Sequence, residues 1–233
     1  YPNEEDWGYV KVDLDKKSLA VAKQYINAVD SSMMRLMLWQ SLIDSVSDAN
    51  LSAETFVEFA MANIPGETDY NVARAIGGGL VKALDYLSTA TRLQIKDYSV
   101  TYAQVENLYL ELLSSAQAGS DLQKYWYSQY VDLSKNSMHL NNLRQILASE
   151  KTFSGLTIDQ DKRWEIVAAL NRYQHGDYLA LLEAEKLRDN SDTGVKYAIY
   201  SEALRPDPEI KAKWFAVVTD NPDRLKLSTL RYI

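Results

Sequence analysis

From residue 16 onward, the apolar side chains of this chain recur with the period of an amphipathic α-helix. In the clearest stretch they fall at positions i, i+3, i+4, i+7 and i+8, which gathers them on one helix face. That stretch contains Val105, Leu108, Tyr109, Leu112 and Leu113. A face of this kind has to be buried against another element. The recurring period therefore constrains the chain to an all-α fold of packed helices.

Glycine and proline residues divide the helical stretches at fairly even intervals. The main breakers are Pro65-Gly66, Gly119, Gly155, Gly176, Gly194, Pro206 and Pro222. The segments between them have the length of ordinary helices and are joined by short connections. Because short connections make successive helices antiparallel neighbours, we expect a superhelical stack of antiparallel helix pairs, HEAT- or armadillo-like. No sequence repeat can be aligned by eye, so any repeats are structural.

The first fifteen residues have a different pattern. Val10, Val12 and Leu14 alternate with polar side chains, which predicts a short, half-buried β-strand. A lone strand needs a partner, so we expect residues 1–15 to be a strand or linker from a preceding domain. Residues 16–233 are then one α-helical domain. The chain begins at Tyr1 without a leader pattern, which favours a fragment of a longer protein.

Three consecutive glycines, Gly77, Gly78 and Gly79, stand inside an apolar helical stripe. Each glycine costs about 1 kcal/mol relative to alanine in a helix interior. A phosphate-binding loop would need a following lysine with serine or threonine, and a preceding strand, and the sequence offers neither. We expect a close approach between helices or a kink, with an actual helix break as the remaining alternative.

Charge and composition exclude several classes of function. The net charge of −7 argues against a nucleic-acid-binding protein and against a surface drawn to anionic lipid. The chain has no cysteine, which excludes disulfides, thiolate metal sites and cysteine nucleophiles but leaves the compartment open. No run of eighteen apolar residues is present, so we expect no membrane span.

A search for catalytic motifs finds none. The signature H-E-x-x-H needs two histidines on one helix face, but the only histidines, His139 and His175, are 36 residues apart. We expect His139 to be an exposed or partly buried helix residue and His175 to cap a helix C-terminus. No G-x-S-x-G elbow is present either. The sequence therefore predicts no catalytic, metal-binding or cofactor-binding residue in this chain.

The stretch "GLTIDQDKRW" contains the acidic pair Asp159 and Asp161. A calcium loop would need a third acidic ligand and a glycine that the stretch lacks. A helix start is the better interpretation, with Thr157 as the N-cap in capping-box spacing with Gln160. The neighbouring Arg163 is expected to bind a carboxylate, either within the fold or in a cavity.

Several short motifs follow one another in a defined order after residue 154. They are Gly155-Leu156, Asp159, Arg163-Trp164, Gly176-Asp177, the step from Glu183 to Asp189, Thr193-Gly194, Arg205-Pro206, and Lys211 with Trp214. Together with the start "EEDWGYVKVDLD" and the segment "MMRLMLWQSLIDSVSDANLSAETF", this series resembles the C-terminal helical domain of the aminopeptidase N family of zinc metallopeptidases, bacterial type. The resemblance covers residues 3 to about 218.

The resemblance implies a parent exopeptidase that uses one zinc ion and an activated water. It implies that this domain is non-catalytic, packs on the catalytic domain of the same polypeptide, covers the active-site chamber and limits or positions peptide substrates. Zinc is expected in that catalytic domain, because the family's zinc and exopeptidase motifs are absent here. Family members continue with more helices, so we expect a truncated domain. The alternatives are a free-standing α-helical repeat interaction module and, less favoured, a self-sufficient enzyme.

Three arginines are candidates for a peptide-substrate channel. Arg35, Arg74 and Arg163 each stand beside an apolar stripe. From there a guanidinium group could bind a peptide carboxylate with two hydrogen bonds. The competing interpretation is a salt bridge within the domain or a solvated face. Peptide preference and oligomeric state are left open by the sequence.

Overall fold

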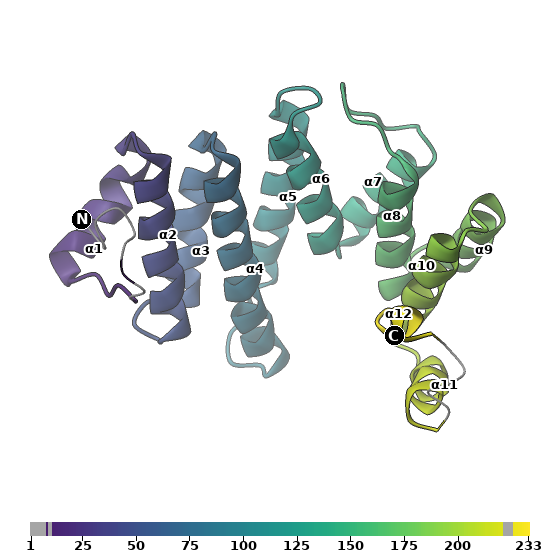
Figure 1. Cartoon of the computed structure of the whole chain (residues 1–233). Coiled ribbons are helices and arrows are strands. Elements are labelled where there is room, and N and C mark those ends of the chain that lie inside the picture. Colours follow the sequence, from purple (N-terminus) through teal and green to yellow (C-terminus); the bar gives the residue numbers. More distant parts are fainter. Residues whose placement is uncertain (1–7, 9–10, 221–225) are drawn as a thin grey trace. The chain divides into compact units, whose positions relative to one another are not determined.

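The structure is a computed structural model that describes residues 8, 11–220 and 226–233. Every regular element within these ranges is a helix (Figure 1), which confirms the expected all-α stack of helix pairs. The chain divides into two compact units, residues 1–125 and residues 126–233. Helix α6 (Asp121–Leu133) begins in the first range and ends in the second.

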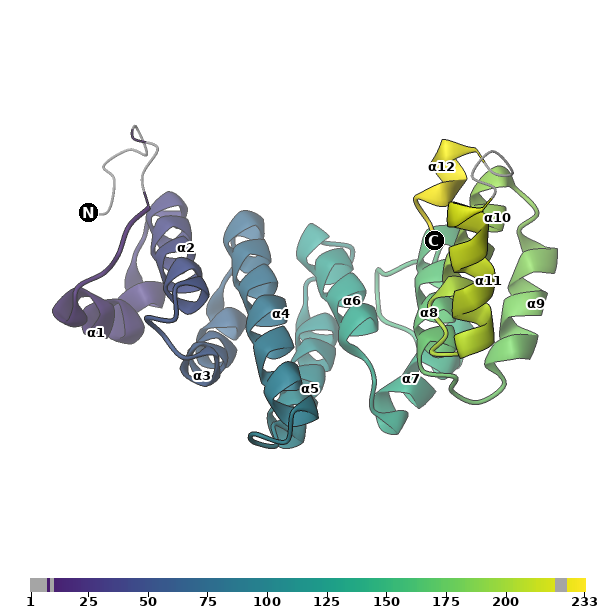
Figure 2. The same cartoon turned by 90° about the horizontal axis from the view of Figure 1, so that it is seen from below.

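The first unit is built from helices in two layers. They are α1 (Lys16–Tyr25), η2 (Ile26–Ala28), α2 (Ser32–Ser47), α3 (Ala53–Asn63), η3 (Ile64–Gly66), α4 (Tyr70–Arg92) and α5 (Ser99–Ser115). Helices α2 and α4 lie side by side in one layer and α1 and α3 lie in the other (Figures 1 and 2). The core between α2, α3 and α4 contains Trp39, Phe56 and Ile76, all without solvent exposure.

The glycines of α4 lie in a continuous helix, which excludes the alternative of a helix break. The expected close approach of neighbouring side chains is present. A Cβ atom at Gly79 would lie 2.7 Å from side-chain atoms of both Ile43 and Phe56. One at Gly77 would lie 2.0 Å from the hydroxyl of Tyr125. Because Gly78 faces open space, only the outer two glycines are explained by the approach of neighbouring side chains.

No helix in the described ranges combines enough length with enough apolar character to cross a membrane. The longest described helix, α4, has 23 residues but carries Lys82 and Asp85 on an exposed face. The finding agrees with the expectation from the sequence.

The second unit is organised around one helix, α8. Its helices are α7 (Ser137–Leu147), α8 (Gln160–Arg172), α9 (Tyr178–Arg188), α10 (Asp192–Ala203), α11 (Pro208–Thr219) and α12 (Leu227–Leu230). Helix α8 packs against α7, α9 and α10. It is apolar over more than one face and buries Trp164, Ile166, Val167 and Leu170 completely. This central position puts the side chains of α8 in contact with three other helices.

Helix starts follow the sequence signals in most places. Ser52 caps α3 and Asp69 caps α4, and both side chains accept hydrogen bonds from backbone N–H groups of the first turn. The expectation that Thr157 caps α8 was wrong. The cap is Asp159, whose Oδ1 lies 3.0 Å from the N–H of Lys162. Asp161 lies in the first turn, where its negative charge favours the exposed N–H groups, as expected.

The expected N-terminal strand is not formed in its described part. Residues 11–15 have no regular secondary structure, while Tyr9 and Val10 of the expected strand lie outside the described residues. A strand is stable only when a neighbouring strand satisfies its backbone groups, and the described part of the chain offers no such neighbour. Helix α1 begins at Lys16, after a cap by Asp15.

Candidate functional site

The adjacent residues Arg163 and Trp164 on α8 both bind acidic side chains of α9 or of the turn that follows it. Arg163 donates from Nη2 to Glu185 Oε2 at 2.6 Å and from Nε to Glu185 Oε1 at 3.0 Å. Trp164 donates from Nε1 to Asp189 Oδ2 at 2.8 Å. Because Glu185 and Asp189 are four residues apart, one helical turn separates the two acceptors. The Arg-Trp pair therefore fixes α9 against α8 at two points that are one helical turn apart.

Further polar groups complete the surroundings of Glu185. Its carboxylate, only 3% exposed, also accepts hydrogen bonds from Gln160 at 2.9 Å and Arg188 at 3.0 Å. Burial by itself raises the pKa of this carboxyl, but the hydrogen bonds from Arg163 and Gln160 outweigh it and leave the pKa lowered. Glu185 is therefore ionised at neutral pH and cannot serve there as a general acid.

The turn between α9 and α10 explains the Thr-Gly motif. A Cβ atom at Gly194 would lie 2.4 Å from the backbone oxygen of Asp189. Only glycine leaves room for this close approach. The carboxylate of the same Asp189 accepts the hydrogen bond from the indole N–H of Trp164. The hydrogen bond that Asp189 accepts from Trp164 is the main reason that the pKa of Asp189 is lowered.

The Arg-Pro motif at the end of α10 is also used inside the unit. Arg205 is buried and donates from Nε to Asn171 Oδ1 at 2.9 Å. Its guanidinium group also lies over the ring of Tyr178, 5.5 Å from the centroid. The amide of Asn171 in turn donates to the backbone oxygens of Val167 and Tyr178. These contacts join α8, α9 and α10 through side chains, so the motif residues are occupied in holding the helices together.

Arg35, a predicted channel residue, lies in a similar arrangement in the first unit. Its Nε and Nη2 atoms each donate to an oxygen of Glu67 at 2.8 Å. Its Nη1 donates to the backbone oxygens of Val29 and Asp30. Glu67 also accepts from the N–H groups that follow it, including that of Asp69 at 2.8 Å. Arg35 thus ties the start of α2 to the loop before α4.

The three predicted channel arginines therefore differ in their surroundings. Arg35 and Arg163 are 12% and 20% exposed and bind carboxylates of their own unit. Arg74 is exposed on α4, with its guanidinium group 5.6 Å from the ring centroid of Tyr70. Arg35 and Arg74 belong to the first unit and Arg163 to the second. Of the three, Arg74 has the guanidinium group most accessible from solvent.

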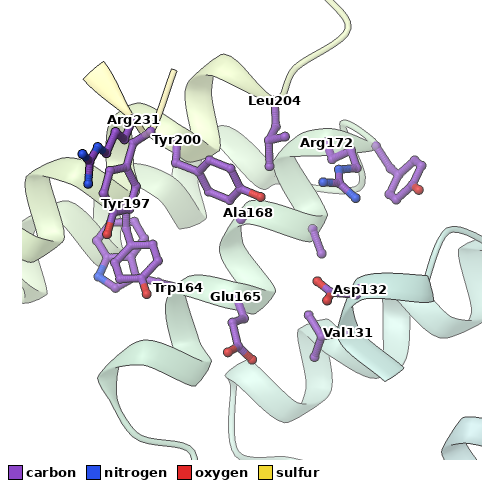
Figure 3. A pocket seen from close by; sticks show the side chains of 13 residues that line it. Val131, Asp132, Trp164, Glu165, Ala168, Arg172, Tyr197, Tyr200, Leu204 and Arg231 are labelled. Carbon is purple, nitrogen blue, oxygen red and sulfur yellow. The ribbon is translucent and has the colours of Figure 1, made fainter. Parts of the chain in front are cut away.

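The second unit contains a cavity of about 330 Å³ that is lined by residues from α6, α8, α10 and the C-terminal segment. Figure 3 shows the carboxylates of Asp132 and Glu165 facing this space. Asp132 is exposed as a residue, yet partial burial of its carboxyl raises the pKa of that group. Glu165 is half-buried, and its Oε2 atom is fully buried without a hydrogen-bond partner among the described residues. Burial, reinforced by the charge of Asp132, raises the pKa of Glu165 to about 7. Glu165 can therefore exchange a proton near neutral pH.

Aromatic rings form one wall of this cavity. Trp164 and Tyr197 are stacked with ring centroids 6.1 Å apart. Tyr232 contacts both Tyr197 and Tyr200 edge to face, at 5.7 and 6.4 Å. Sequence reasoning missed this site. The three-residue spacing of Tyr197 and Tyr200 was a signal that they share a helix face, but no local pattern relates them to Glu165.

The histidines and acidic residues offer no metal site in the described part of the chain. No group of three or more His, Cys, Asp or Glu side chains lies close enough there to hold an ion. His139 is 1% exposed, so the expectation of an exposed or partly buried residue was wrong; its Nδ1 lies 3.1 Å from the hydroxyl of Tyr130. His175 follows the end of α8, and its Nε2 lies 2.9 Å from Asn141 Oδ1.

Comparison with known proteins gives two matches. A family model described as an ERAP1-like C-terminal domain matches residues 1–233, the whole chain. Aminopeptidase N from Streptomyces lividans is 29% identical over 220 residues. That alignment covers 93% of this chain but 25% of the relative, so the chain spans about a quarter of the relative's length. The matches confirm the resemblance carried by the ordered motifs, and the chain belongs to the family of ERAP1-like C-terminal domains.

Proposed function

We propose that this chain is the non-catalytic C-terminal domain of an aminopeptidase N-like zinc metallopeptidase. In that role it covers the active-site chamber and limits or positions the peptide substrates. Its partners are the catalytic domain of the same polypeptide and the peptides themselves. Zinc belongs to the catalytic domain, where it activates the attacking water.

One observation carries the proposal. The family model for a C-terminal domain matches all 233 residues, and the chain spans a quarter of a relative named Aminopeptidase N. A chain that spans a quarter of such a protein corresponds to one of its domains.

The contacts of the motif residues support a structural role. Arg163 binds Glu185, Trp164 binds Asp189, and Arg205 binds Asn171. Charged groups that are paired and largely shielded in this way hold helices in place. In the proposed role, these contacts keep the domain that covers the chamber rigid.

Arg74 is the leading candidate for peptide contact, because its guanidinium group is exposed. Arg35 and Arg163 would contact a peptide only with the part of the guanidinium group that their carboxylate partners leave exposed. In the intact aminopeptidase, Arg74→Ala should raise KM for long peptides more than for dipeptides. Arg92→Ala removes an exposed arginine from the same helix and serves as the control. Equal KM values for the two variants at every peptide length would exclude the contact.

The covering role is tested by removing residues 1–233 from the intact aminopeptidase. Hydrolysis of a short aminoacyl chromogenic substrate should persist, while peptides that exceed the normal length limit and folded proteins with free N-termini become substrates. An unchanged length limit would contradict the covering role. Release of the chromophore by the 233-residue chain alone after zinc addition would contradict its non-catalytic nature.

A further inference from the structure

The cavity beside Glu165 has the composition of a binding site for an organic cation. Its acceptors are carboxylates, and its wall is made of the rings of Trp164, Tyr197, Tyr200 and Tyr232. Rings attract cations through their negative faces. The volume of about 330 Å³ falls within the usual range for small-molecule sites.

The buried oxygen of Glu165 lacks a donor. Among the residues that the structure describes, its Oε2 atom has no hydrogen-bond partner, and neither Glu165 nor Asp132 forms an ion pair. A buried acceptor without a donor is unfavourable. A ligand that brings both a positive charge and an N–H donor would remove this cost.

We propose that this cavity binds an alkylammonium ion, such as the side chain of a lysine. The ammonium group donates to Glu165 Oε2 and lies near Asp132, and the methylene groups lie against the tyrosine rings. A lysine side chain suits such a site because its stem is apolar and its end is charged. A divalent metal fits less well, because no third metal-ligating side chain joins the two carboxylates among the described residues.

Two arginines also line the cavity, and their positions fit this assignment. Arg172 lies on the same side as Asp132, and Arg231 lies near Tyr197 at the opposite side (Figure 3). Neither is in an ion pair with a described residue. Between them, the space next to Glu165 is bordered by carboxylates and rings. The charge of Arg172 already acts on Asp132, against the effect of burial on the pKa of that carboxyl, so Glu165 is the main acceptor for an ammonium group.

The proposed site should depend on pH through Glu165. Charged and titratable groups surround it on every side. They are Tyr127 and Asp132 on α6, Asp159, Asp161, Lys162, Arg172 and Tyr173 at or near α8, Tyr197 and Tyr200 on α10, and Arg231 and Tyr232 in the C-terminal segment. Burial and the nearby acidic groups raise the pKa of Glu165 to about 7. An ammonium ion binds the ionised carboxylate, so binding displaces a proton. Affinity should therefore rise about ten-fold between pH 6 and pH 8, as the ionised fraction increases.

The test is calorimetric titration of the 233-residue chain with N-acetyl-L-lysine methylamide and with n-butylamine. N-acetyl-L-norleucine methylamide is the uncharged control. We expect both amines to bind at pH 8 and the norleucine derivative to bind about ten-fold more weakly or not at all. Tighter binding of the lysine derivative would identify a peptide side chain as the source, and tighter binding of n-butylamine would identify a small free amine. Both results support the cation site.

Variants make the assignment specific. Glu165→Gln and Asp132→Asn should each weaken binding of the amines by about ten-fold, whereas Glu58→Gln, an exposed glutamate on α3, should leave it unchanged. At pH 7, titration in two buffers of different ionisation enthalpy should show release of about half a proton, which Glu165→Gln abolishes. Circular dichroism establishes that each variant is folded.

Three results would overturn the proposal. They are absence of amine binding at pH 8, equal binding of the norleucine derivative, and unchanged binding and proton release in Glu165→Gln. Because the titration uses this chain alone, its outcome is independent of whether the chain covers an aminopeptidase chamber.

Discussion

The guanidinium group of Arg163 binds the carboxylate of Glu185 at 2.6 and 3.0 Å, across the interface of α8 and α9. Both partners are largely shielded from water. In such a pair, the loss of one partner leaves the other as an uncompensated buried charge. The pair is therefore more sensitive to single substitutions than the ion pairs on the surface of the same helices.

Glu185→Gln should lower the free energy of unfolding by about 3 kcal/mol, because it leaves Arg163 without its ionised partner. Chemical denaturation at pH 7 measures the change. The matched control is Glu183→Gln, two residues earlier on α9, whose side chain is 64% exposed and pairs with Lys186. An exposed pair of this kind contributes less than about 0.5 kcal/mol. Equal losses in the two variants would mean that the buried pair is no stronger than the surface pair.

Alanine substitutions at Gly78 and Gly79 of α4 should change the stability of the chain in opposite directions. Gly78→Ala should stabilise the chain by about 1 kcal/mol, because the new methyl group faces open space and alanine favours the helix. Gly79→Ala should destabilise it by about 1–2 kcal/mol, because its methyl group overlaps Ile43 and Phe56. Thermal unfolding of both variants measures the difference. A gain in stability at both positions would contradict the close approach.

Glu165 should make the chain less stable as pH rises. Its pKa is about 7 in the folded chain, against an ordinary value of 4.5, so the folded state binds more protons between these values. Stability from this group is present below about pH 4.5 and is lost as pH rises through 7. Glu165→Gln should therefore be more stable than the natural sequence at pH 8, by about 1–2 kcal/mol after allowance for partial solvent screening.

The measurement is the unfolding free energy of both proteins from pH 5 to pH 8. The difference should grow with pH through this interval. Glu58→Gln, which is exposed, controls for the change in net charge and should show no such trend. A difference that is constant across the interval would contradict the raised pKa.

Asp159 and Thr157 are competing candidates for the cap of α8, and substitutions separate them. Asp159→Ala should cost about 1 kcal/mol, because it removes the acceptor for the N–H of Lys162. Thr157→Ala should cost almost nothing, because this side chain lies outside the helix start. Urea denaturation of the two variants decides, and a larger loss for Thr157→Ala would restore the interpretation made from the sequence.

The helices were predictable because their apolar period is local. The stripe that ends at Leu113 is buried as expected. The breakers Gly119, Gly155, Gly176 and Pro206 fall between helices, whereas Gly194 lies in the first turn of α10 and Pro65-Gly66 belong to η3. The cap of α8 was mistaken because Thr157 and Asp159 are both good cap residues, and tertiary packing selects between them. His139 was foreseeable as a buried residue, since it shares the α7 face of Leu143 and Ile146.

The candidate site was predictable only in part. The sequence predicted that Arg163 would bind a carboxylate, either within the fold or in a cavity. In the structure that carboxylate belongs to Glu185, 22 residues later in the chain. Nothing local indicated the cavity. Asp132, Glu165 and Tyr232 come from distant segments, and their meeting depends on how α6, α8 and the C-terminal segment pack.

The two contacts that start from Arg163 and Trp164 together fix the register of α9 along α8. Their acceptors, Glu185 and Asp189, stand 22 and 25 residues further along the chain. A shift of α9 along α8 by one helical turn would break both contacts at once. Each pair therefore depends on the register that the other pair also requires. Over evolutionary time these positions should change as matched pairs, arginine with glutamate and tryptophan with aspartate, even where the intervening turn gains or loses residues.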